Sequence, residues 1–213
     1  MENIDKNEEM VSGDLQLEIG GEHFEVSMTI PAGAVKPGRM LPVLQNLTNS
    51  IVARGVERSV ENGKPISCKA ACGACCRQPL LISEAEAFAL ADLVGKMPEE
   101  RRNIIEQRFH DGRKHFEELS WFDRFDEMSA EAKKGKSDEL GQRFVALLSE
   151  YIAEGIPCPF LENESCSIYH DRPLICREYL VTSPAENCVA PRPETIEKLK
   201  ISGSPSRAFA SLV

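Results

Sequence analysis

Several features are missing from this sequence or scarce in it, and each excludes a class of protein. No apolar run approaches the ~20 residues of a membrane span, and residues 1–5 lack the basic flank and apolar stretch of a signal peptide. Positive charge is scarce, with 25 Lys and Arg against 34 Asp and Glu and a formal net charge of -9. Such an acidic surface repels phosphate backbones and anionic lipids. We therefore expect a soluble cytoplasmic protein that binds neither nucleic acid nor membrane.

The sequence also lacks the motifs of several common enzyme classes. No Gly-rich loop follows a strand and opens a helix, because Gly20 and Gly21 lie within a hairpin pattern. No serine or cysteine stands in a recognisable hydrolase context. These absences argue against a methyltransferase of the usual kind and against a hydrolase. They leave open whether the protein is an enzyme of another type.

Cysteine, by contrast, is abundant, and its eight residues fall into two groups. The members are Cys68, Cys72, Cys75 and Cys76, followed far downstream by Cys158, Cys166, Cys176 and Cys188. Cytosolic thiols are kept reduced, so clustered cysteines there more often bind metal or act in catalysis than form disulfides. The even count permits disulfides, but the crowding in residues 68–76 would strain them. We interpret all eight as candidate metal ligands.

The hydrophobic pattern predicts a mainly α fold, namely a small helical domain with an N-terminal β-hairpin and an irregular cysteine-rich C-terminal segment folded around a metal site. We divide the chain into a tail and hairpin, residues 1–38, and a helical cysteine-cluster metal-binding domain, residues 39–213, with motif halves 68–76 and 158–188. A polar tail is expected over residues 1–13 and the hairpin over residues 14–30. Helices are expected over residues 40–62, from a capping box at Ser83, beyond Pro98, near residues 121–128, and from Ser137 to about Gly155.

Beyond Gly155 the helical periodicity disappears and prolines interrupt the chain. Only two short helices are expected there, over residues 173–179 and 193–201. A segment this irregular buries little apolar area, yet it carries four cysteines. Metal binding can contribute on the order of 10 kcal/mol to the folding of such a segment. We therefore expect metal to order it.

The spacing of the first cysteine group suits soft metals. Cys72 and Cys75 form a Cys-x2-Cys knuckle, in which two sulfurs from one tight turn face the same ion. Adjacent side chains diverge in a regular backbone, so Cys75 and Cys76 fit better if each faces a different metal, as in a cluster or a two-metal site. Thiolates select zinc or iron–sulfur clusters over magnesium, calcium or manganese. The residues leave both cofactors open, and we place the iron–sulfur cluster first.

Two separated stretches carry a resemblance to a known family. They are the run Cys68-x3-Cys72-x2-Cys75-Cys76, and the downstream elements Cys158-Pro159-Phe160-Leu161, Cys166-Ser167-Ile168-Tyr169, Arg172-Pro173 and Cys176-Arg177. Together they resemble the YkgJ-type cysteine-cluster proteins, also called the CxxCxxCC family, a zinc- or iron-chelating domain. The resemblance spans about Cys68 to Cys188. It implies metal chelation with the eight cysteines as the ligand pool, and it does not imply a reaction.

Two arginines are candidate cofactor-binding residues. Arg172 and Arg177 bracket Cys176, and their fixed donors could hydrogen-bond sulfur or neutralise an anionic thiolate cluster. Surface salt bridges with the abundant acidic residues are the alternative for both. We interpret His170, beside Asp171, as a solvated loop residue rather than a ligand.

Four functions compete. The first is a metal-binding protein with a redox or electron-transfer role, and the second is a structural zinc module that contacts a protein partner. The third is a radical S-adenosylmethionine enzyme, suggested by the spacing of Cys68, Cys72 and Cys75. Ala74 stands where that class has an aromatic, and no βα repeats are apparent, so we disfavour it. The fourth, by the family resemblance alone, is a metal-dependent enzyme related to flagellin lysine-N-methylase.

Overall fold

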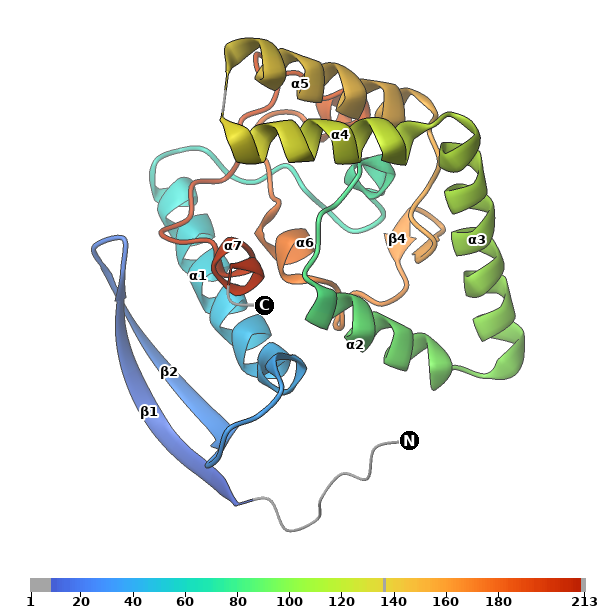
Figure 1. The fold of residues 1–213 in the computed structure, drawn as a ribbon. Coiled ribbons are helices and arrows are strands. Elements are labelled where there is room, and N and C mark those ends of the chain that lie inside the picture. The colour runs from blue at the N-terminus through green and yellow to red at the C-terminus, as the bar shows by residue number, and fades with distance from the viewer. Residues whose placement is uncertain (1–8, 136, 212–213) are drawn as a thin grey trace.

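A computed structural model describes residues 9–135 and 137–211 and confirms the mainly α character of the chain. Figure 1 shows α1, α2, α3 and the α4–α5 pair arranged around a central region that contains α6 and β4. The helices are α1 (Leu41–Glu61), α2 (Glu84–Gly95), α3 (Glu99–Glu118), α4 (Trp121–Lys134), α5 (Asp138–Ala153), α6 (Leu174–Glu178) and α7 (Pro205–Ala210). Short 3₁₀ turns are η1 (Pro37–Met40), η2 (Ala74–Arg77) and η3 (Ala185–Val189).

The N-terminal hairpin is confirmed and is longer than predicted. Strands β1 (Met10–Ile19) and β2 (Glu22–Pro31) pair in antiparallel register, with Ile19 opposite Glu22 across Gly20 and Gly21. Both glycines have positive φ, as a tight two-residue turn requires. The predicted polar tail, residues 1–13, is wrong at its end, because β1 begins at Met10. Its residues 1–8 lie outside the described part of the chain.

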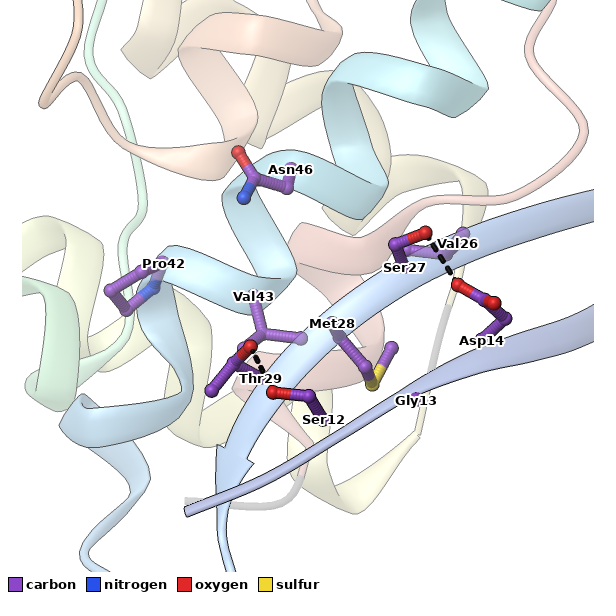
Figure 2. A pocket seen from close by; sticks show the side chains of 10 residues that line it. All are labelled: Ser12, Gly13, Asp14, Val26, Ser27, Met28, Thr29, Pro42, Val43 and Asn46. Atoms are coloured by element: carbon purple, nitrogen blue, oxygen red, sulfur yellow. Dashed lines mark hydrogen bonds between the residues drawn. The ribbon is translucent and has the colours of Figure 1, made fainter.

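One face of the hairpin packs on α1 through Phe24, Val26 and Ile51, so the hairpin buries its apolar side chains against the first helix. A groove of about 550 Å³ lies between the two strands and the start of α1 (Figure 2). Ser12, Asp14 and Asn46 are among its polar lining residues, and the lining includes no cysteine. This groove is therefore separate from the candidate metal ligands.

The helices α2 to α5 begin where the sequence signals place them. Ser83 and Glu86 form the predicted capping box at the start of α2, and the Ser137 side chain accepts the Leu140 N–H at the start of α5. Helices α4 and α5 pair and meet the end of α3 in an apolar cluster. Trp121 is central to it and donates its indole N–H to the Leu147 carbonyl at 3.0 Å. This cluster contains no cysteine.

The chain after α5 is irregular, as predicted, but its elements differ in part from the prediction. A small hairpin, β3 (Leu161–Glu162) and β4 (Ser165–Cys166), was not foreseen, whereas α6 confirms the helix expected at residues 173–179. The helix expected over residues 193–201 is wrong. Its backbone pairs with another segment instead, since the Thr182 N–H bonds the Glu197 carbonyl and the Leu199 N–H bonds the Leu180 carbonyl. The last helix is α7.

Neither sheet in the described residues is part of a βα unit. Each consists of two antiparallel strands, β1 with β2 and β3 with β4. The βα barrel of the radical S-adenosylmethionine alternative is therefore absent from residues 9–135 and 137–211. No helix in that part of the chain combines the length and apolar character needed to cross a bilayer.

Candidate metal centre

The first cysteine group lies on the loop between α1 and α2 and is anchored at its start by a distant segment. The Ser67 N–H donates to the Val181 carbonyl at 2.9 Å, and the Val181 N–H points at the Cys68 sulfur at 3.5 Å. A backbone N–H aimed at sulfur favours the thiolate over the thiol. Farther along, η2 carries both Cys75 and Cys76. The two ends of the group are thereby held by different parts of the fold.

The end of the loop is joined to the second cysteine group by a close backbone approach. The Cys158 N–H donates to the Cys76 carbonyl at 2.7 Å. Gly73 faces the β3–β4 turn so closely that a Cβ there would lie 2.6 Å from a Glu164 carboxylate oxygen. That carboxylate forms a two-pronged ion pair with Arg77, at 2.7 and 3.0 Å. Apart from the glycine itself, no feature of the sequence indicated this junction.

Cys158 and Cys166 sit on an apolar layer formed by α2 and α3. They pack against a buried cluster that comprises Val94, Ile105, Phe160 and Ile168. Each sulfur accepts a hydrogen bond from the backbone N–H two residues later, which opposes the burial that raises the pKa of both thiols. Two sulfurs with backbone donors in this arrangement suit metal ligation, because hydrogen bonds to sulfur stabilise bound thiolate.

Cys176 is placed by α6, whose first turn is held by a buried carboxylate from α2. Glu86 is 4% exposed and accepts the Leu174 N–H at 2.9 Å with one oxygen and the Ser83 N–H and hydroxyl with the other. One side chain thus caps two helices at once. Burial raises the pKa of the Cys176 thiol to about 12. The capping box predicted the local role of Glu86, and its reach to α6 was missed.

Cys188, in η3, is the most enclosed of the eight cysteines and lies beside the first group. It is 4% exposed, and its carbonyl accepts a 3.0 Å hydrogen bond from the Gln78 side chain. Burial raises the pKa of Cys188, and a hydrogen bond from the Tyr179 hydroxyl to its sulfur partly opposes that rise. Burial raises the pKa of Tyr179 to about 12. Tyr179 was expected from the sequence to pack over the site, whereas the contact of Gln78 was not predicted.

The two candidate arginines occupy different surroundings. Arg177 is 5% exposed and donates to the carbonyls of Arg172 and His170 and to the Asn49 side chain. Its guanidinium therefore holds the loop before α6 against α1. Arg172 instead stacks over the Tyr169 ring, 3.8 Å from its centroid. Burial raises the pKa values of Cys166 and Cys176, and the positive charge of Arg172 opposes that rise; the same charge adds to the lowering of the pKa of Cys75.

Two histidines contact residues other than the cysteines. His115 pairs with Glu154 at 2.7 Å on the surface, and His170 contacts the Tyr169 ring. His170 is exposed, as the sequence interpretation expected.

Cys75 is the electrostatic centre of the group. A hydrogen bond from the Cys76 thiol lowers the pKa of Cys75 to about 7, with a smaller contribution from the charge of Arg172. The reciprocal bond raises the pKa of Cys76. The Cys75 charge in turn raises the pKa values of thiols in both halves of the motif, Cys68, Cys76, Cys158, Cys166, Cys176 and Cys188. These effects agree with the backbone bond between Cys158 and Cys76, which brings the two halves of the motif together.

All eight cysteines are free thiols. Within residues 9–135 and 137–211, no three His, Cys, Asp or Glu side chains are grouped as the ligands of one metal ion would be. The donor chemistry nevertheless fits a soft metal or cluster, with eight thiols, backbone donors to sulfur and one arginine facing them. The thiols are gathered around Cys75 without converging on a single point.

Comparison with known protein families matches the part of the chain that carries these cysteines. Residues 67–199 match the model of a family described as CxxCxxCC, "Putative zinc- or iron-chelating domain". The match covers more than half of the chain and includes all eight cysteines. The chain belongs to the CxxCxxCC family. No curated protein and no solved structure matches it. Family membership therefore supports chelation of zinc or iron, and the structure of this CxxCxxCC protein supplies the residue surroundings.

Proposed function

We propose that this CxxCxxCC protein binds an iron–sulfur cluster or zinc through the thiolates of its eight cysteines. The family description supports metal chelation in general. The ligand residues are our proposal, namely Cys68, Cys72, Cys75, Cys76, Cys158, Cys166, Cys176 and Cys188.

The observation that carries the proposal is the 2.7 Å hydrogen bond from the Cys158 N–H to the Cys76 carbonyl, which brings the two cysteine groups together. The two groups are separated along the chain by α2, α3, α4 and α5, yet the Cys75 charge acts on thiols of both. Gathering so many thiols in a reducing compartment has an ordinary explanation in metal binding. The absence of disulfides among the eight supports the same interpretation and our proposal of a cytoplasmic location.

The surroundings of the thiols also support an anionic metal–thiolate centre. The Val181 N–H faces the Cys68 sulfur, and the Arg172 charge acts on three further thiols. Arg172 would neutralise part of the centre's charge directly, while Arg177 would contribute by fixing the loop that carries Arg172. Hydrogen bonds and charges of this kind tune the potential of an iron–sulfur centre, so we propose redox or electron transfer as its role.

A structural zinc module is the second candidate, and one specific observation favours it. The segment from Pro157 to Ser204 contains only a hairpin with two residues in each strand, β3–β4, and the short helices α6 and η3. It nevertheless carries four cysteines. Zinc on these thiols would stabilise the segment and present it to a protein partner. This candidate predicts metal-dependent folding with no redox activity.

Purification without oxygen distinguishes these candidates. Iron, zinc and acid-labile sulfide are measured per chain, and the absorbance spectrum is recorded. Iron with sulfide and a broad brown absorption supports the cluster, whereas colourless protein with stoichiometric zinc supports the structural module. Folded protein that contains no metal and binds none when iron with sulfide, or zinc, is added would contradict the proposed function.

A further inference from the structure

The hairpin β1–β2 combines an open strand edge, an uncovered apolar strip and negative charge, and we propose that β1 binds an extended segment of a partner protein. The segment alternates apolar residues with Lys or Arg, and it adds to the hairpin as a third strand. Residues 9–31 contain no cysteine, so this surface is separate from the candidate metal ligands and the proposal does not depend on the bound metal.

The outer edge of β1 carries backbone groups that β2 does not use. Ile19 faces Glu22 across a two-residue turn, which a hydrogen-bonded pair flanks, so alternate residues from Ile19 back to Val11 bond β2. The Ala32 N–H continues this alternation by bonding the Glu9 carbonyl at 2.8 Å. The intervening residues direct their N–H and C=O groups outward, and no other segment within residues 9–135 and 137–211 pairs with them. Such an edge is a template for an added strand.

The helix α1 covers the apolar face of β2 but leaves part of the same face of β1 uncovered. Figure 1 shows β2 lying between α1 and β1. Val26 is 6% exposed, whereas Leu15, opposite it on β1, is 43% exposed. Val11, on the same face, is 52% exposed, and a Cβ at Gly13 between them would meet nothing within 4 Å. This apolar strip, Val11, Gly13 and Leu15, therefore has room for the apolar side chains of another strand.

The charge of the hairpin is negative throughout. Residues 9–31 include no Lys or Arg, and their carboxylates are Glu9, Asp14, Glu18, Glu22 and Glu25. Asp14 and Glu18 are exposed on β1, on the face opposite the apolar strip. Opposite charges on facing residues of neighbouring strands attract. A strand that places Lys or Arg beside Asp14 and Glu18 also places its intervening apolar residues beside the apolar strip.

The same charges argue against a second copy of this chain as the occupant. Two β1 edges paired with each other bring the acidic residues of one copy next to those of the other, and facing like charges destabilise a strand pair. The formal net charge of -9 adds repulsion between copies. A basic segment is instead attracted both by the hairpin and by the whole molecule, which also speeds its association.

The test uses reduced full-length protein and fluorescein-labelled peptides, with binding measured by fluorescence anisotropy at about 0.1 M salt. The probe alternates Lys and Val over eight residues. One comparison peptide alternates Glu and Val, and the other carries the Lys and Val residues of the probe in two blocks. We expect the probe to bind saturably and both comparison peptides to bind about tenfold more weakly. Equal affinities for the three peptides, or no binding of the probe at any soluble concentration, would overturn the proposal.

Peptides methylated on backbone nitrogen distinguish strand addition from general charge attraction. One version of the probe carries N-methyl groups on its Lys residues and the other on its Val residues, so each version lacks the N–H groups of one strand edge. Only the edge that faces β1 donates hydrogen bonds to it. One version is therefore expected to bind like the probe and the other to lose binding. Equal affinities for the two versions would overturn the proposal, and this comparison requires no substitution in the protein.

Charge reversal on the hairpin locates the site. Asp14→Lys with Glu18→Lys should weaken binding of the Lys and Val probe by about tenfold and strengthen binding of the Glu and Val peptide. Asp126→Lys with Glu127→Lys, at exposed positions of α4, is the matched control, because it changes the net charge equally and should have a smaller effect. Equal effects of the two double variants, with native circular dichroism spectra, would overturn the proposal. If the hairpin variant unfolds, the methylated peptides decide.

Sedimentation tests a second copy as the alternative occupant of the apolar strip. Unsubstituted protein and Leu15→Lys are expected to sediment alike at the concentrations of the binding assay. A dimer that Leu15→Lys abolishes would assign the strip to a second copy of the chain and overturn the proposal.

Discussion

The backbone N–H of Cys158 donates a 2.7 Å hydrogen bond to the carbonyl oxygen of Cys76. This bond joins the two halves of the cysteine motif directly, residue to residue. Gly73 and the Arg77–Glu164 ion pair lie beside it and hold the same loop against the β3–β4 turn. The junction does not depend on any sulfur, so it can align the two halves before metal binds.

Gly73→Ala should disrupt this junction. The added methyl would lie 2.6 Å from a Glu164 oxygen and 2.8 Å from a Leu161 side-chain carbon, so both side chains must shift and the Arg77–Glu164 ion pair is disturbed. We expect a loss of about 1 to 3 kcal/mol in the free energy of unfolding, measured with urea, and weaker metal binding. Gly33→Ala is the control, because a Cβ there meets nothing within 4 Å. Equal stability of the two variants would contradict the close approach.

Glu86→Gln should destabilise both α2 and α6. The substitution replaces one carboxylate oxygen by an amide NH₂, which cannot accept the N–H groups of Ser83 or Leu174 that the carboxylate accepts now. We expect a loss of about 1 to 3 kcal/mol in thermal or chemical unfolding. The exposed neighbour Glu84, in the same helical turn, provides the matched variant Glu84→Gln, for which we expect a change below about 0.5 kcal/mol.

Arg177→Ala should leave buried oxygens without donors. The guanidinium bonds two backbone carbonyls and the Asn49 side chain while only 5% exposed, so its loss should cost about 3 kcal/mol in the free energy of unfolding. Arg54→Ala serves for comparison, because Arg54 forms an exposed pair with Glu57 and should cost little. Similar stabilities for the two variants would show that Arg177 is not a structural anchor.

In metal-free protein, Cys75 should be the first thiol to react as pH rises. Its pKa is lowered from 9.0 to about 7, chiefly by the Cys76 hydrogen bond, whereas the pKa of Cys176 is raised to about 12 by burial. Alkylation by iodoacetamide, followed by peptide mass spectrometry, should show a midpoint near pH 7 for Cys75 and little modification of Cys176. Cys76→Ala removes the donor and should move the Cys75 midpoint upward. An unchanged midpoint would contradict the proposed cause.

The same shift affects the stability of the metal-free fold. A thiol whose pKa is lower in the folded than in the unfolded protein stabilises the fold above the unfolded value, here 9.0. That contribution disappears as pH falls through about 7. The pKa values of Cys68, Cys158 and Cys166 are raised, chiefly by burial, so these thiols act in the opposite direction, and their contribution is lost as pH rises through their folded values. Comparison of Cys75→Ala with unsubstituted protein isolates the Cys75 contribution.

Much of the fold could be predicted from sequence because local signals determine it. The Gly20-Gly21 turn, the Ser83 and Ser137 caps and the periodicity of α1 each act within a few residues, and all are confirmed. The division at residue 38 stays a prediction. The helix expected over residues 193–201 failed because partners distant in sequence took its backbone groups, as in the bond from Thr182 to Glu197. Local patterns carry no information about such pairing.

The candidate site, like the fold, could be predicted from sequence only in part. Spacing alone singled out the eight cysteines, and the range that matches the family model includes all of them. The sequence could not show that Cys188 lies beside Cys68 or that Glu86 reaches α6. Nor could it show that Arg177 faces backbone oxygens while Arg172 faces thiols. Each of these relationships depends on how the irregular segment after α5 folds back across the first loop.

The most direct test of the central claim is a map of thiol protection in the metal-loaded protein. Native protein, purified without oxygen, is labelled with N-ethylmaleimide before and after removal of metal by a chelator, and each cysteine is quantified by peptide mass spectrometry. The claim predicts that all eight cysteines are protected when metal is bound and that all become reactive when it is removed under denaturing conditions. Protection that is unchanged by metal removal, or confined to Cys68, Cys72, Cys75 and Cys76, would contradict it.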